Sequence, residues 1–114
     1  MAENDKFFRM LGLAARMRGI AFGEGAVKDA IRDGKAQLVV VAADASENTK
    51  KKFKNSCGFY SAKLIEYSDK VTLGRYTGRG FAVVLAVMNQ GIADELLKCF
   101  GDGLEICQQK GEEL

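Results

Sequence analysis

Two uninterrupted apolar runs constrain the fold of this chain more than any other feature. "AQLVVVAA" at residues 36–43 and "GFAVVLAVM" at residues 80–88 contain no charged residue and are rich in β-branched side chains. Strands that are buried on both faces have this pattern, whereas a strand with one face in water alternates apolar and polar residues. A sheet built on such strands needs a layer of helices on each side.

Helices and further short strands are predicted between and around these two runs. Apolar residues at helical spacing predict helices over residues 4–19, 23–34, 46–58, 68–78 and 89–101, and residues 20–22 and 62–67 are short strand candidates. The expected N-caps are Asn4 or Asp5, Ser46, and Ser68 or Asp69, and the expected ends are Gly19 and Gly78. Alternating helices and strands predict an α/β protein with a mostly parallel or mixed sheet that is covered on both faces.

The charge of the chain is unevenly distributed. The 114 residues have a net charge of +2, but residues 1–88 hold 15 Lys and Arg against nine Asp and Glu, while residues 89–114 hold two against six. A basic body suggests a polyanionic partner, although a mixed, solvated surface has the same composition. The run of Lys50, Lys51, Lys52 and Lys54 is open to the same two interpretations, a solvated helix face or long-range attraction to RNA. We expect residues 1–101 to form one domain and the acidic residues 102–114 to form a tail.

Several classes of protein are disfavoured by what the sequence lacks. No apolar run approaches the roughly 18 residues of a membrane span, and the N-terminus does not resemble a secretion signal, so we expect no membrane partner and a cytoplasmic location. The chain has no histidine, and Cys57, Cys99 and Cys107 form an odd set without C-x-x-C spacing. The central acids are scattered: Asp29, Asp33, Asp44 and Glu66. We therefore predict no catalytic site, metal site or cofactor.

The stretch "GIAFGEGAVKDAI", residues 19–31, is a candidate anion site. Its spacing fails both the P-loop pattern and the dinucleotide fingerprint, in which a third glycine would replace Lys28. What remains is a helix start whose backbone N–H groups can hold a phosphate, including one from RNA. The candidate contacts are Gly23, Glu24, Gly25, Lys28 and Arg32. The alternative is an ordinary glycine-rich corner between a strand and a helix.

A second candidate is "LGRYTGRGFAVV", residues 73–84. Glycines at 78 and 80 allow a close backbone approach, and Arg75 and Arg79 can contact phosphates or stack on bases. Phe81 could belong to the core or meet an unstacked base. The alternative is a helix that ends at Gly78 and leads directly into a buried strand.

Read together, several stretches resemble the kink-turn-binding ribosomal protein family of archaeal L7Ae, and most of all its small bacterial YlxQ-like members. The resemblance covers about residues 5–100 and rests on "FFRMLGLAARMRGIAFGE", "AQLVVVAADASENTKKKF", "CGFYSAKLIEYSDKVTLGRYTG" and "AVVLAVMNQGIADEL" in that order. It implies a three-layer α/β/α sandwich with a central mixed sheet of about four strands. It also implies binding of structured RNA, as part of the ribosome or of translation.

The same resemblance implies a particular RNA-binding face. The family motif G-x-N-E-x-x-K reads sheared G·A pairs, and Gly23 matches its first position, while Gly25, Ala26 and Asp29 fall where the family has its Asn, Glu and Lys. Lys70 matches an RNA-contacting lysine. The loop of Gly78, Arg79, Gly80 and Phe81 matches a segment that packs on a flipped-out base, and residues 42–46 match a loop beside the same face. The resemblance therefore implies recognition of RNA shape and phosphates with weakened base reading.

These observations lead to one main hypothesis and two alternatives. We expect a non-enzymatic, monomeric RNA-binding protein whose partner is structured RNA, kink-turn-like or ribosomal. The first alternative is a protein-interaction module that acts through the acidic C-terminal segment. The second is a small α/β enzyme or nucleotide binder, against which the missing histidine and the failed phosphate-loop patterns argue.

Overall fold

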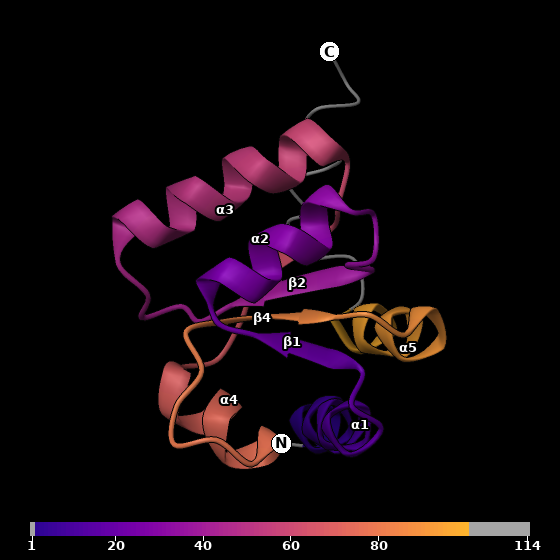
Figure 1. Cartoon of the computed structure of the whole chain (residues 1–114). Helices are drawn as coiled ribbons and strands as arrows, with labels where there is room; N and C mark the ends of the chain where they lie inside the picture. Colours follow the sequence, from indigo (N-terminus) through magenta and orange to yellow (C-terminus); the bar gives the residue numbers. More distant parts are fainter. Residues whose placement is uncertain (1, 101–114) are drawn as a thin grey trace.

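The computed structural model of the chain describes the backbone of residues 2–100 and the side chains of residues 6–99, and helices and strands alternate along this range (Figure 1). The elements are α1 (Ala2–Arg16), β1 (Ile20–Phe22), α2 (Glu24–Arg32), β2 (Leu38–Val41), α3 (Glu47–Tyr60), β3 (Leu64–Glu66), α4 (Lys70–Thr77), β4 (Val84–Val87) and α5 (Gln90–Phe100). Each predicted helix and strand is present; β1 has the predicted bounds, and the other three strands are shorter than the predicted runs that contain them.

The strands form one mixed sheet in the order β1-β4-β2-β3. β4 pairs antiparallel with both β1 and β2, and β2 pairs parallel with β3. The apolar runs at residues 36–43 and 80–88 therefore contain the two central strands. All four residues of each central strand are buried, which explains why neither run tolerates a charge.

Helices cover both faces of the sheet, as Figure 1 shows. Along β2, Leu38 and Val40 pack in one core with residues of α1, α4 and α5, whereas Val39 and Val41 pack in a second core with residues of α2 and α3. Side chains alternate between the faces because successive Cβ atoms of a strand point in opposite directions. The α/β/α sandwich with a four-stranded mixed sheet is thus confirmed.

The ends of α1 differ from the prediction. The helix begins at Ala2, before both predicted caps, Asn4 and Asp5. At its other end the left-handed residue is Arg18, with φ of 60°, rather than Gly19. The Gly19 amide donates to the Ala14 carbonyl at 2.8 Å, so the chain closes the last turn of the helix one residue earlier than the glycine suggested.

Two further expectations concern the C-terminal residues and membrane-spanning helices. The predicted acidic tail, residues 102–114, lies outside the described residues. Among the helices that the structure describes, none combines the length and apolar content that crossing a membrane requires.

Candidate nucleic-acid interface

The ends of all four strands bring distant loops together at one edge of the sheet. Phe22, the last residue of β1, pairs with Leu85 near the start of β4. Val41, the last residue of β2, pairs with Val84 on one side and with Glu66 on the other. The loops that follow β1, β2 and β3 therefore meet the loop that precedes β4. Figure 1 shows α2 and α3 starting at this same edge, on the left of the picture.

Hydrogen bonds between backbones fix these loops to one another. The Ala42 amide donates to the Val83 carbonyl at 2.8 Å, and the Ala82 amide donates to the Lys70 carbonyl at 2.9 Å. The Asp44 carboxylate accepts from the Lys70 amide at 3.0 Å. The loop after β2, the start of α4 and the loop before β4 are consequently hydrogen-bonded to one another and form one surface.

Three helices start on or beside this edge, and their N-termini differ. Ser46 caps α3 by accepting from the Thr49 amide, and Asp69 caps α4 by accepting from the Thr72 amide. The pKa of Asp69 lies below its usual value, mainly because its carboxylate accepts a hydrogen bond from the Thr72 backbone amide. The N-cap of α2 is Gly23, which has no side chain and makes no cap hydrogen bond. Among these helices, α2 is the one that has no side-chain cap, so its first-turn N–H groups can face an external anion.

Glycine at position 23 is required by the backbone. Its φ of 92° and ψ of 153° lie in a region that L side chains rarely adopt. No atom outside the neighbouring residues lies within 4 Å of where a Cβ would be, for Gly23 or for Gly25. The backbone at the start of α2 is therefore open to a ligand from outside.

Glu24 is the first residue of α2 and is tied to α3. The Lys52 ammonium donates to its carboxylate at 2.8 Å, and the Thr49 hydroxyl donates at 3.4 Å. The hydrogen bond from Lys52 is the main reason that the pKa of Glu24 lies below its usual value. This pair joins the two helices on the outer side of the sheet and neutralises one lysine of the run on α3.

The loop between α4 and β4 packs tightly on α4. A Cβ at Gly74 would lie 2.4 Å from the Phe81 Cα, so only glycine allows this approach. Gly78 ends α4 with a φ of 82°. The Arg79 guanidinium carbon lies 4.1 Å from the centre of the Phe22 ring, a cation–π geometry that connects the loop to β1. Phe81 is 61% exposed, so it belongs to the surface and not to the core.

A pocket of about 350 Å³ lies where this loop meets the start of α2. Its lining includes Phe22, Gly23, Glu24, Arg79 and Phe81. An aromatic ring, a guanidinium and an open backbone around one hollow can stack on a base and contact a phosphate. Residues from the two candidate stretches of the sequence thus line one pocket.

The structure brings most of the predicted residues to this face. Those at the edge of the sheet or in the loops there are Gly23, Glu24, Gly25, Lys70, Gly78, Arg79, Gly80 and Phe81. Lys28 is exposed one turn into α2, near enough for its charge to lower the pKa of Glu24. Arg75 is exposed on α4, where its charge lowers the pKa of Asp69.

Arg32 is not brought to the face. It ends α2, about 13 Å along the helix from Gly23 at 1.5 Å per residue. Its guanidinium pairs with Asp29 at 3.1 Å and with Asp33 at 3.2 Å. These contacts raise the pKa of Arg32, first through the hydrogen bond to Asp33.

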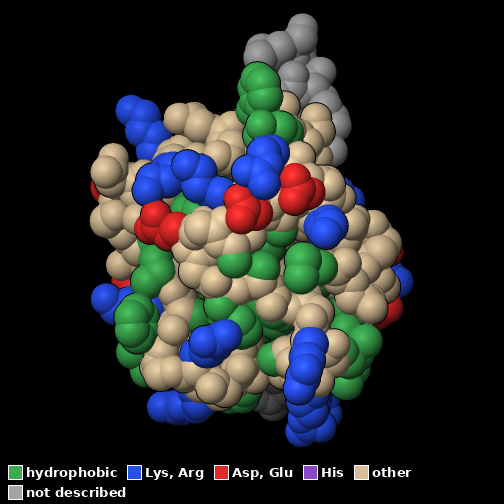
Figure 2. Space-filling model, in the orientation of Figure 1, with side chains coloured by type: hydrophobic (Ala, Val, Ile, Leu, Met, Phe, Trp, Pro, Cys, Tyr) green, Lys and Arg blue, Asp and Glu red, His purple; other side chains and the backbone are tan. Residues whose placement is uncertain are grey.

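The lysine run on α3 contributes less free charge than the sequence suggested. Lys50 pairs with Glu47 and Glu66, Lys52 with Glu24, and Lys54 with Glu66. Figure 2 shows Lys and Arg side chains gathered over α3, with acidic side chains beside them over α2. This part of the surface is accordingly a mosaic of both signs.

Three residues that support the candidate face were not among the candidate contacts named from the sequence. Lys52 entered there only as part of the lysine run, and Asp44 only among the scattered acids and within the loop of residues 42–46. Phe22 supports Arg79, Lys52 holds Glu24, and Asp44 holds the start of α4. Asp44 carried a local signal, since an acid just after a buried strand often bonds to nearby backbone. The described residues contain no group of three or more Cys, Asp or Glu side chains that could hold a metal ion.

Comparison with known proteins identifies the family of this chain. The sequence model of the ribosomal protein L7Ae/L30e/S12e/Gadd45 family matches residues 5–97. The chain belongs to this family. The resemblance to the L7Ae family that its sequence indicated is therefore confirmed.

Individual relatives within the L7Ae family cover most of the chain. The RNA-binding protein YlxQ of Bacillus subtilis is 39% identical over 92 residues, which are 81% of this chain and 92% of YlxQ. The large ribosomal subunit protein eL30 of Methanoregula boonei is 32% identical over 79% of this chain and 92% of its own. A solved structure from Bacillus halodurans, of unknown function, has a TM-score of 0.82 at 34% identity, covering 85% of this chain and 98% of that one.

Proposed function

We propose that this L7Ae-family protein is a non-enzymatic, cytoplasmic RNA-binding protein that acts on structured RNA in the ribosome or in translation. One observation carries the proposal: the open N-terminus of α2, the Arg79 loop and Lys70 lie at one edge of the sheet. The names of two relatives, RNA-binding YlxQ and ribosomal eL30, support RNA as the ligand. We expect the protein to act as a monomer.

The proposed face recognises RNA by its backbone and shape. The first-turn N–H groups of α2 receive a phosphate, and Lys28, Lys70 and Arg75 supply positive charge around it. Phe81 and the Arg79 guanidinium border the pocket that takes an unstacked base. Arg32, held by two carboxylates at the far end of α2, is left out of the proposed face.

Three residues of α2 limit how well the proposed face can read bases. The family reads sheared G·A pairs with the side chains of an Asn, a Glu and a Lys, where this chain has Gly25, Ala26 and Asp29. A bidentate base contact is worth roughly 1–3 kcal/mol of discrimination in the DNA case. We therefore expect a kink-turn RNA or a ribosomal RNA fragment to bind with moderate affinity and with tolerance of changes in the G·A pairs.

Gel-shift titrations with a kink-turn RNA and with ribosomal RNA fragments, each at two salt concentrations, test the proposal. Arg79→Ala should weaken binding about tenfold and lower the slope of log K against log salt by about one. Arg32→Ala is the matched control, because it removes an arginine of the same charge outside the proposed face. No shift at micromolar protein, or equal losses in both variants, would contradict the proposal.

A further inference from the structure

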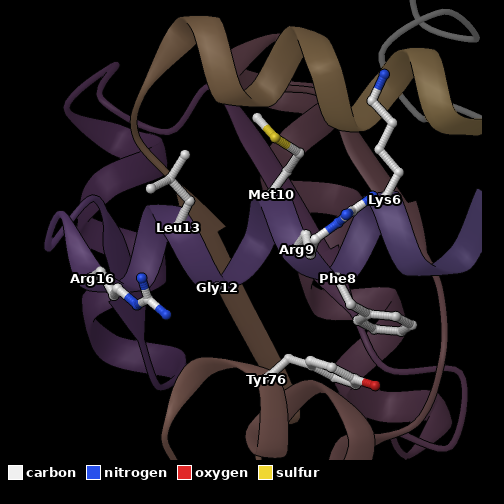
Figure 3. Close-up of a pocket in the computed structure, with 8 residues that line it drawn as sticks. All are labelled: Lys6, Phe8, Arg9, Met10, Gly12, Leu13, Arg16 and Tyr76. Carbon is white, nitrogen blue, oxygen red and sulfur yellow. The ribbon is translucent and has the colours of Figure 1, made fainter.

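A second hollow lies on the outer surface of the layer formed by α1, α4 and α5. It has a volume of about 590 Å³ and lies along α1 beside α4 (Figure 3). Seven of its lining residues come from α1, and one, Tyr76, comes from α4. Apart from Tyr76 it takes nothing from the elements that form the proposed RNA face. We call it the α1 groove.

The floor of the α1 groove is set by a close approach of two helices. A Cβ at Gly12 would lie 3.1 Å from the Tyr76 carbonyl oxygen, so the absence of a side chain at Gly12 lets α4 come close. Beside it the rings of Phe8 and Tyr76 stack, with their centroids 4.5 Å apart and their planes 18° from parallel. Figure 3 shows these two rings on one side of α1 and no side chain at Gly12 between them and Leu13. The hollow is thus a built feature of the helix pair.

Large apolar side chains are exposed along the groove. Leu13 is 43% exposed, Tyr76 is 43% exposed, and Met17, one turn beyond Leu13, is 52% exposed. The opposite face of α1 is already occupied, because Phe7, Leu11 and Ala14 are buried in the core. Contiguous exposed apolar patches mark interaction sites, and Leu13 and Tyr76 line the same hollow.

The charged residues that line the groove are all cations: Lys6, Arg9 and Arg16. Lys6 pairs with Glu95 at 3.7 Å, whereas Arg9 and Arg16 make no ion pair with any residue that the structure describes. The α4 helix contributes no acidic residue along its length, Lys70–Thr77. An occupant with acidic groups would therefore meet the guanidinium groups of Arg9 and Arg16 on both sides of Leu13.

The spacing matches a helical ligand. Residues 6, 9, 13 and 16 follow one another at three and four positions, which places them on one stripe of α1. At 1.5 Å per residue this stripe is about 15 Å long, equal to roughly three turns of a second helix. We propose that the α1 groove binds an amphipathic helical segment of a partner protein, with apolar anchors over Gly12 and Leu13 and acidic residues against Arg9 and Arg16.

A protein partner fits the groove better than an RNA or a membrane does. Aromatic residues, Met and Arg are enriched in protein interfaces, and exposed Leu13 and Met17 gain nothing from a phosphate backbone. A helix that lies on a membrane presents a protruding apolar face, whereas this surface is hollowed at Gly12. This site is separate from the proposed RNA face and does not depend on the proposed function.

The test uses the whole protein and a designed probe, a fluorescein-labelled helical peptide of about 14 residues with Leu on one stripe and Glu elsewhere. Fluorescence anisotropy should give a micromolar Kd. The double variant Arg9→Glu/Arg16→Glu should weaken binding by more than about tenfold, and Leu13→Ser by several fold. Lys35→Glu/Lys51→Glu reverses two exposed charges elsewhere and should leave the Kd within about twofold.

Three results would overturn the proposal. One is no peptide binding at a protein concentration of several hundred micromolar. Another is equal binding of a second peptide in which Ser replaces every Leu, because charge alone would then explain the affinity. The third is a loss of binding to structured RNA, or to anionic vesicles, in Arg9→Glu/Arg16→Glu with the peptide unaffected. Circular dichroism of each variant, matching wild type, excludes unfolding as the cause of a loss.

Discussion

Replacing Gly74 by alanine should destabilise the protein and displace the loop that carries Arg79 and Phe81. The added Cβ would lie 2.4, 2.7 and 2.9 Å from the Cα, N and C atoms of Phe81. Ordinary carbon contacts are about 3.5–4.0 Å long, so the loop has to move by about 1 Å. Because every clashing atom belongs to the backbone, no change of rotamer relieves the contact.

The size of the effect follows from two opposing contributions. Overpacking of a tight interior costs about 1–3 kcal/mol, and alanine regains about 1 kcal/mol over glycine inside a helix. The loop resists the shift, because the Arg79 amide donates to the Gly74 carbonyl at 2.7 Å and the Ala82 amide donates to the Lys70 carbonyl at 2.9 Å. We therefore expect a net loss of up to about 2 kcal/mol, which lowers Tm by up to about 15 °C.

Thermal unfolding followed by circular dichroism, together with urea titration, measures this loss. Gly25→Ala is the matched control, since a Cβ there meets nothing within 4 Å, and it should leave stability unchanged or raise it by up to about 1 kcal/mol. Gly12→Ala, with a single contact of 3.1 Å, should fall between the two. A Gly74→Ala variant as stable as Gly25→Ala would refute the close packing of Phe81 on α4.

Three further outcomes are expected from the caps, the ion pair and the thiol. Ser46→Ala removes the cap of α3 and should cost about 1 kcal/mol in urea unfolding, while Ser46→Asn should retain most of the stability. Glu24→Gln breaks the half-exposed pair with Lys52 and should lower stability by less than about 1 kcal/mol at pH 7. Because folding lowers the pKa of Glu24, its contribution to the free energy of unfolding is full above the usual pKa of 4.5 and is lost as the pH falls through the pKa of the folded state. Wild type and Glu24→Gln should therefore converge in Tm at low pH. Burial raises the pKa of the Cys99 thiol, so in a Cys107→Ser background iodoacetamide should modify Cys99 more slowly in the native than in the unfolded protein, as mass spectrometry would detect.

The sequence predicted those parts of the fold that depend on local patterns. Uninterrupted apolar runs located the two central strands, and Ser46 and Gly78 marked helix ends because their side-chain and backbone preferences act within a few residues. The direction of strand pairing was less accessible. β4 is antiparallel to both its neighbours, which depends on contacts between segments more than 40 residues apart for β2 and β4. The end of α1 was misplaced since Arg18, and not the adjacent glycine, adopts the left-handed conformation.

The partners of the site residues were beyond the sequence for the same reason. Glycine spacing located both stretches of the candidate face, but Arg79 meets Phe22 and Glu24 meets Lys52 only through tertiary packing. The free charge of a side chain is likewise a property of the fold. In the sequence, Arg32 and the lysines of α3 cannot be distinguished from Lys28 as free cations. In the structure, carboxylates pair with Arg32 and Lys52.

The hydrogen bonds of its acidic residues distinguish the proposed RNA face more than its number of cations does. Asp69 caps α4 and Asp44 accepts from the Lys70 amide, so the donors at the start of that helix are already occupied. At the start of α2, Gly23 leaves the corresponding donors uncapped, and Glu24 is drawn sideways to Lys52. An anion that approaches this edge therefore finds more open backbone donors at α2 than at α4, because the fold has satisfied those of α4 internally. We therefore expect the glycine corner to contact a phosphate, and Lys70 and Arg79 to contact other parts of the RNA.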